Sequence, residues 1–283
     1  MTKERTRRGT VRLLALCDNT SSSSGLGKEW GLSLAITLPG ARLWIFDTGQ
    51  TPLFLTNAQK LGLALDTAQG VVLSHGHYDH TGGLWALLER LQYKGPVYGH
   101  PFATRARYSL KKGSPARSIG MPFKALSQMS TFVEIQKSRE LDDGLTFFTD
   151  IGRIPGNFEP VQGFYFDEEG TQPDTIRDDS FLLAETPKGP VAIMGCCHSG
   201  LANSLLHLRE QTGVDKLHAV VGGLHLGYAS PAALDETADI LRQFSVEVVY
   251  AGHCTGDRAA ARLSQALPGV IQGLGSGRTI SFG

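Results

Sequence analysis

Apolar residues near the start of the chain recur in short runs typical of β-strands. Such runs lie at 11–17, 32–38 and 42–47, and Pro39-Gly40 separates the last two. A tight turn of this kind brings consecutive strands side by side in antiparallel orientation. We therefore expect the chain to enter its fold through an antiparallel sheet.

Beyond residue 70 the apolar pattern alternates between strand and helix. Four strand-like runs are each followed by apolar residues at helical spacing, and these runs lie at 71–74, 191–194, 217–221 and 246–250. Ser230 followed by Pro231 marks a helix start, because serine suits the N-cap and proline the first helical position. Strands that alternate with helices predict a layered α/β architecture.

The regular pattern is lost between about residues 95 and 178, where basic residues stand among Gly, Pro and Ser. This segment lacks a repeated apolar pattern that would give it a core of its own. We therefore interpret it as an insertion into one domain that spans residues 1–283. The 41% apolar content of the chain is ample for one large core.

Composition restricts the partners that the protein is expected to have. Lys plus Arg and Asp plus Glu both number 27, so no global field attracts nucleic acid or an anionic membrane, and a small-molecule substrate is expected. No apolar run of about 18 residues suits a membrane span, and the polar N-terminus does not resemble a signal peptide. We expect a cytoplasmic protein with four reduced cysteines; the oligomeric state stays open.

The strongest chemical pattern is His75-Gly76-His77-Tyr78-Asp79-His80, which follows a strand-like run. Residues two apart on an extended chain project to the same side, so His75 and His77 can close on one metal ion. The turn into the next helix directs Asp79 and His80 toward a second ion. Four ligand-type side chains in six positions predict a metal centre.

Three more histidines, His198, His225 and His253, follow later strand-like runs. Because ligands gather at the carboxyl ends of strands in an α/β sheet, we expect them to meet His75 at one sheet edge.

The pattern His75-x-His77-x-Asp79-His80 resembles the signature of the metallo-β-lactamase superfamily. Asp47-Thr48-Gly49 resembles its early strand-end motif. Five segments together resemble the subfamily labelled after a dihydropterin-ribofuranosylaminobenzene 5′-phosphate synthase, and these are 18–19, 30–33, 195–200, 222–226 and 252–256. The resemblance implies an αββα sandwich and two divalent metal ions, zinc in the first instance, with iron or manganese as alternatives.

The resemblance also implies which residues hold the ions. His75, His77 and His198 would bind one ion, and Asp79, His80 and His253 the other, with Asp47 as an outer partner. Most members have a histidine on a hairpin and later a bridging aspartate at a strand end, whereas here Asp179 precedes His198. Asp179 is therefore a candidate ligand, and a cap or a salt bridge to Arg177 is its alternative role.

Cysteines stand beside two of these histidines. Cys196 and Cys197 are neighbours, so at most one of them can reach the site, and we expect Cys196, Cys197 and Cys254 to belong to the core. His225 is left over by the ligand count. It is a candidate general acid, or a group that binds an anionic part of the substrate, and a structural histidine bonded to a loop carbonyl is the alternative.

These patterns favour a metal-dependent hydrolase that uses a metal-bridging hydroxide on a phosphorylated or otherwise anionic small molecule. Asp79 and His225 would be its catalytic residues. A pterin-type synthase that releases phosphate or pyrophosphate is one alternative, and a di-iron redox or sensing protein is another. No G-x-S-x-G, P-loop or GxGxxG pattern offers a competing chemistry.

Overall fold

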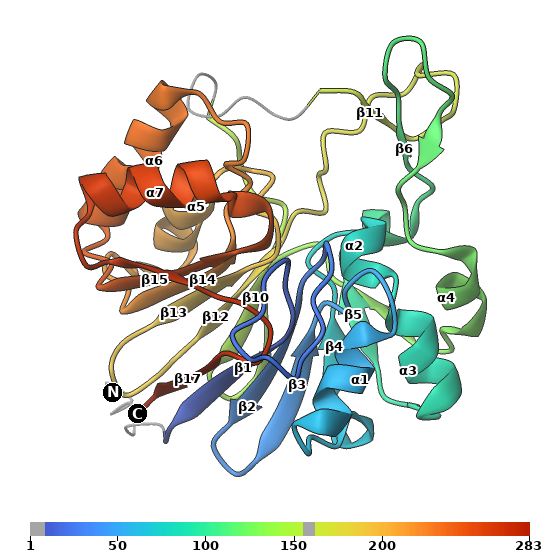
Figure 1. Cartoon of the computed structure of the whole chain (residues 1–283), viewed down its shortest axis with the longest axis horizontal. Helices are drawn as coiled ribbons and strands as arrows, with labels where there is room; N and C mark the ends of the chain where they lie inside the picture. Colours follow the sequence, from blue (N-terminus) through green and yellow to red (C-terminus); the bar gives the residue numbers. More distant parts are fainter. Residues whose placement is uncertain (1–8, 155–161) are drawn as a thin grey trace.

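The computed structural model describes residues 9–154 and 162–283, and two seven-stranded sheets form its centre (Figure 1). The first sheet contains, in spatial order, β17 (Thr279–Phe282), β1 (Val11–Cys17), β2 (Ser33–Leu38), β3 (Arg42–Phe46), β4 (Gly70–Val72), β5 (Val97–Gly99) and β8 (Phe132–Glu134). The second contains β16 (Ile271–Gly273), β15 (Val248–Gly252), β14 (Ala219–Gly223), β13 (Val191–Met194), β12 (Phe181–Ala184), β10 (Leu145–Phe148) and β9 (Arg139–Asp142).

Helices cover the outer face of each sheet. Those on the first sheet are α1 (Leu53–Lys60), α3 (Leu84–Arg90) and α4 (Phe123–Gln128), and those on the second are α5 (Leu201–Thr212), α6 (Pro231–Gln243) and α7 (Asp257–Ala266) (Figure 1). The short helix α2 (Tyr78–Thr81) and the 3₁₀ turns Leu65–Thr67, Pro101–Thr104 and His253–Thr255 lie in loops.

Three apolar clusters match this layering. Side chains such as Trp44, Phe46 and Ile193 fill the space between the two sheets. One outer cluster packs α1 and α3 against the first sheet. The other packs α5, α6 and α7 against the second sheet. The expected αββα sandwich is therefore confirmed.

Most of the expected elements are also confirmed. The run at 11–17 is β1, and β2 pairs with β3 in antiparallel register. Ser230 caps α6, since its side chain accepts a hydrogen bond from the backbone N–H of Ala233, and Pro231 is the first helical residue. None of the helices described here has the length and apolar character needed to cross a bilayer.

The segment at about 95–178 is less separate than its sequence suggests. It contributes β5 and β8 to the first sheet and β9 and β10 to the second. Among the described residues of the segment, a small three-stranded sheet stands apart from the two main sheets, and it is formed by β11 (Phe164–Tyr165), β6 (Tyr108–Ser109) and β7 (Arg117–Ser118) (Figure 1). Strands of two to four residues are too short to produce a readable apolar period, which explains the difference.

Candidate metal centre

The candidate site lies where the two sheets present the carboxyl ends of their parallel strands. His75 follows β4 of the first sheet, and β3, β4 and β5 are parallel there. His198, His225 and His253 follow β13, β14 and β15 of the second sheet, which are also parallel. The expectation that all four histidines share one sheet edge is therefore wrong. They meet because the edges of two facing sheets converge.

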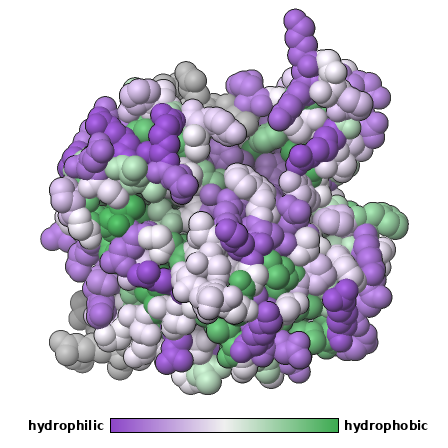
Figure 2. All heavy atoms as spheres, in the orientation of Figure 1, coloured by the Kyte–Doolittle hydropathy of each residue, from purple (hydrophilic) through white to green (hydrophobic). Residues whose placement is uncertain are grey.

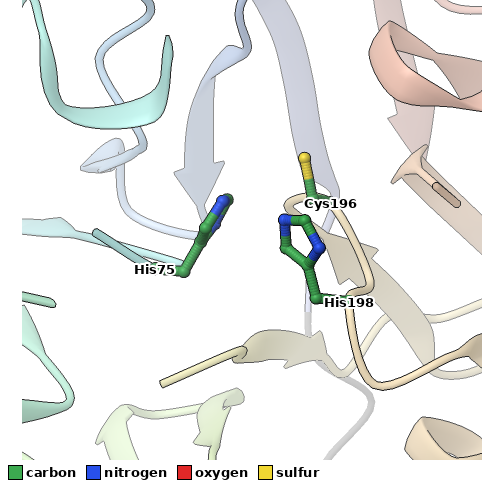
Figure 3. A group of neighbouring side chains, drawn as sticks. All are labelled: His75, Cys196 and His198. Atoms are coloured by element: carbon green, nitrogen blue, oxygen red, sulfur yellow. The ribbon is translucent and has the colours of Figure 1, made fainter. Parts of the chain in front are cut away.

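Three groups of potential metal-binding atoms share the Cys196 sulfur. His75, Cys196 and His198 form the first group (Figure 3), His80, Cys196 and His253 form the second, and Cys196, His225 and Cys254 form the third; within each, the ligand atoms lie within 4.8 Å of one another. The third group brings the thiol of Cys254, which was expected to belong to the core, to the site. The Nε2 atom of His80 lies 3.1 Å from Cys196 Sγ and 3.1 Å from His253 Nε2. Cys196 thus stands between two potential ion positions.

The position of Cys196 corrects the expectation that it serves only the core. It is buried, but its thiol faces the histidines, whereas the neighbouring Cys197 turns to Ser204 Oγ at 3.7 Å. Cys196 comes two residues after the end of β13. The available signal was the opposed directions of adjacent side chains, which let only one of the two neighbouring cysteines face the site.

The remaining expected ligands lie beside these groups. His77 Nδ1 is 3.0 Å from His75 Nε2, and the Asp79 carboxylate is 3.5 Å from His253 Nε2. Asp79 also accepts a hydrogen bond of 2.8 Å from the indole Nε1 of Trp30. The half-exposed Trp30 lies in one of the segments that resemble the subfamily, but the sequence gave no signal for its contact with Asp79.

Polar partners fix the histidine rings from behind. The carboxylate of Asp47 lies 2.7 Å from His80 Nδ1 and accepts two bonds from Ser74, one from its backbone N–H and one from its hydroxyl. Asn19 Oδ1 lies 3.1 Å from His253 Nδ1. These contacts hold Nδ1 of each ring and leave Nε2 directed toward the site. A proton on Nδ1 and a free Nε2 is the tautomer that a metal ligand needs.

Burial controls the charge of the cluster. It lowers the pKa of His75, His77, His198 and His253 well below the usual value, and the neighbouring histidines add to the effect. These rings are therefore neutral, and neutral imidazole is the form that binds metal. Burial opposes charge at His80 as well, but Asp47 outweighs it and raises the pKa of His80 to about 9.

Unpartnered polar atoms show that the cluster suits a metal ion. His77 Nε2 and both ring nitrogens of His198 are buried without a hydrogen-bond partner among the described residues. Leaving such groups unpaired costs about 1–3 kcal/mol each. Coordination by a divalent cation would remove that cost, so the donor set fits the metal that the family resemblance implies.

His225 and Cys254 form a pair at the edge of the cluster. The backbone N–H of His225 donates to Cys254 Sγ at 3.3 Å, and the His225 ring lies 4.3 Å from the ring of His198. Burial disfavours the charged forms of the His225 ring and the Cys254 thiol, but the interaction between the two groups favours them. The interaction with Cys254 raises the pKa of His225. Hydrogen bonds from Cys196 and His225 lower the pKa of Cys254 to about 5. His225 Nδ1 is buried and has no partner among the described residues, so no loop carbonyl bonds it.

Asp179 lies outside all three ligand groups. One of its oxygens accepts the backbone N–H of Ser199 at 2.6 Å, and the other is buried without a partner among the residues described. Burial raises the pKa of Asp179 to about 6 against the effect of the Ser199 bond. The alternative salt bridge to Arg177 is wrong, because Arg177 pairs with Asp150.

Two adjoining cavities open at the cluster. The smaller cavity, of about 490 Å³, is lined by His77, Asp79 and His198, and by Lys111 and Arg117 of the β6–β7 hairpin. The larger, of about 1330 Å³, extends over α6 and α7, and both cavities are lined by Trp30, Phe164, His225, His253 and Cys254. Hydrophilic side chains cover the projecting hairpin at the upper right of Figure 2.

Comparison with known proteins agrees with this geometry. The family model described as the metallo-beta-lactamase superfamily matches residues 32–253. The 7,8-dihydropterin-6-methyl-4-(beta-D-ribofuranosyl)-aminobenzene-5′-phosphate synthase of Methanocaldococcus jannaschii is 28% identical over 282 residues, which cover 94% of each chain.

Solved structures agree as well. One described as a metal-dependent hydrolase of the beta-lactamase superfamily is 29% identical, has a TM-score of 0.82, and is matched over 95% of this chain and 98% of that one. A diphosphatase from the PhnP family shares the fold, with 16% identity, a TM-score of 0.57, and coverage of 96% and 97%. The family model spans most of the chain, including the histidine motif and His253, and the chain therefore belongs to the metallo-β-lactamase superfamily.

Proposed function

We propose that this protein is a metal-dependent hydrolase with two divalent ions, zinc in the first instance, acting on a phosphorylated or otherwise anionic small molecule. The observation that carries the proposal is that Cys196 joins two of the ligand groups, one with His75 and His198 and one with His80 and His253. His75, His77 and His198 would hold one ion, and Asp79, His80 and His253 the other, and the sulfur of Cys196 lies within reach of both groups. Two such ions lower the pKa of a shared water to about 7 and polarise the bond under attack.

Other residues of the chain orient and protonate. Trp30 holds the Asp79 carboxylate, while Asp47 and Asn19 hold the rings of His80 and His253. His225 lines both cavities, and an imidazole there can deliver a proton to a leaving oxygen. The chain then needs no nucleophilic side chain of its own.

The charges around the smaller cavity favour an anionic substrate. Lys111 and Arg117 line it, and Asp79 is its single carboxylate among the described residues. Arg117 also donates to the hydroxyl of Tyr78 at 2.7 Å, so its guanidinium is held close to the histidine motif. Cationic side chains beside a metal centre can bind a phosphate group at one end of a substrate.

The test combines metal analysis with a substrate panel. Protein purified without chelator and supplemented with zinc should contain about two ions per chain. It should hydrolyse phosphomonoesters or phosphodiesters faster than a neutral lactone or thioester. A reproducible content of zero or one ion would reject the dinuclear site, and a fully loaded protein inactive on the whole panel would reject the hydrolase.

A pterin-type synthase is the second candidate, because the relative from Methanocaldococcus jannaschii is named as a synthase. In that reaction the same cations would bind the phosphate or pyrophosphate that is released. Release of pyrophosphate or phosphate only in the presence of a second, amine-bearing substrate would favour the synthase. The same ligands also accept iron, so colour and electron paramagnetic resonance of the purified protein would separate a di-iron redox or sensing protein from both.

A further inference from the structure

A completely buried arginine connects the small three-stranded sheet to the metal centre. Arg107 directly precedes β6, and its side chain has no exposed surface. Its guanidinium lies 2.6 Å from Asp178 Oδ1 and 3.2 Å from Asp174 Oδ2, and it donates to the carbonyl of Phe102 at 2.9 Å. An arginine removed from water is costly unless it is paired. Of the two aspartates, Asp178 accepts a hydrogen bond from the guanidinium, whereas Asp174 Oδ2 makes an ion pair with Arg107 and has no hydrogen-bond partner among the described residues.

The second oxygen of Asp178 reaches the metal-binding loop. Asp178 Oδ2 accepts the backbone N–H of Gly76 at 2.8 Å, and Gly76 lies between His75 and His77. On its other side Gly76 is closed in, because a Cβ placed there would lie 2.3 Å from the carbonyl oxygen of Ala103. The peptide that joins the two histidines is therefore clamped between Asp178 and the 3₁₀ turn Pro101–Thr104.

We infer that Arg107 and Asp178 are positioning residues that hold the His75–His77 pair in its metal-binding geometry. The inference rests on the proposed metal site. Asp178 offers one oxygen to each of two donors, and Arg107 prevents the carboxylate from rotating away from Gly76 N–H. The segment that carries the β6–β7 hairpin thereby sets the affinity of the ion bound by His75, His77 and His198.

Two variants separate this role from a general contribution to folding. Asp178→Asn keeps the shape of the side chain but leaves one acceptor oxygen for two donors, so either Gly76 or Arg107 loses its bond. Asp174→Asn is the matched control, since it weakens the other ion pair of Arg107 and leaves the bond to Gly76 intact. A purely structural network would respond to both substitutions alike.

The experiment is a titration of the metal-free chain with zinc against a chromophoric chelator, with the thermal midpoint of each metal-free protein recorded alongside. Asp178→Asn should lower the affinity for one of the two ions about 10- to 100-fold, which is the usual effect of losing an outer partner of a ligand. The affinity for the other ion should stay within about threefold of wild type. Asp174→Asn should leave both ions within about threefold of wild type. Cobalt absorption should change in Asp178→Asn and not in Asp174→Asn.

Outcomes that contradict the inference differ from those that contradict the proposed function. Wild-type binding of two ions together with unchanged binding by Asp178→Asn, or an equal loss in Asp174→Asn, overturns the positioning role alone. A wild-type chain that binds no ion overturns both. If Asp178→Asn does not fold, Arg107→Lys replaces it, because an ammonium group keeps the charge without the planar fork, and it should weaken the same single ion.

Discussion

Replacing Asp47 with asparagine tests the support behind the metal centre most directly. The wild-type carboxylate accepts three hydrogen bonds of 2.7 Å each, from the Ser74 backbone N–H, the Ser74 hydroxyl and the ring of His80. Asparagine offers one acceptor oxygen and places an amide donor where the other oxygen stood. It also tolerates the left-handed backbone of this position, φ 57°, so the change adds no strain.

The expected cost follows from these three bonds. The Ser74 hydroxyl can turn to His75 Nδ1, which is 2.9 Å away, but the backbone N–H and the His80 ring then compete for one oxygen. One buried donor remains unpaired, which lowers the free energy of unfolding of the metal-free protein by about 1–3 kcal/mol. Because His80 loses its fixed orientation, metal affinity should fall about 10- to 100-fold.

Urea unfolding of the metal-free protein and zinc competition measure the two effects. Asp150→Asn is the matched control, since Asp150 also has a left-handed backbone, φ 53°, but its carboxylate meets Arg177 at the exposed surface. The control should lose less than about 1 kcal/mol and bind zinc normally. The reasoning is refuted if Asp47→Asn stays within about 0.5 kcal/mol and threefold of the wild type.

Three further predictions concern residues at the cavity. Asp79→Ala should reduce the rate of hydrolysis far more than it lowers the thermal midpoint, and the two are measured side by side. If the variant keeps more than about a tenth of the wild-type rate, which is a barrier change under about 1.4 kcal/mol, Asp79 is not a ligand. His225→Ala should keep both ions and lose about 10²- to 10⁴-fold on substrates with poor leaving groups but much less on activated esters, and metal loss would make His225 a ligand instead. Trp30→Phe should lower the rate about 5- to 10-fold through the lost bond to Asp79, and an unchanged rate contradicts the positioning of Asp79 by Trp30.

Strong local patterns predicted the layers of the fold and the ends of its main strands. The motif from His75 to His80 and the later strand ends were readable because each depends on residues close together in the chain. The sequence did not predict that the edges of two sheets converge at the site, because the order in which short strands pair depends on contacts between residues far apart in the chain. The single edge expected for His75 and His198 failed for that reason.

The supporting contacts could not be predicted for the same reason. Trp30 reaches Asp79 across 49 residues, and Asp178 reaches Gly76 across 102. Cys196 was misjudged because buried cysteines most often belong to the core, and its role depends on which face of the strand end is turned to the histidines.

The position of the centre between two sheets would also make a bound metal ion a cross-link. His80 and Cys196 are separated by 116 residues along the chain and follow strands of different sheets. Closing a loop on the order of 100 residues costs an unfolded chain about 4–5 kcal/mol in entropy, so the unfolded state cannot gather both groups around one ion. Metal binding therefore favours the native state almost exclusively and ties the stability of the first sheet to that of the second.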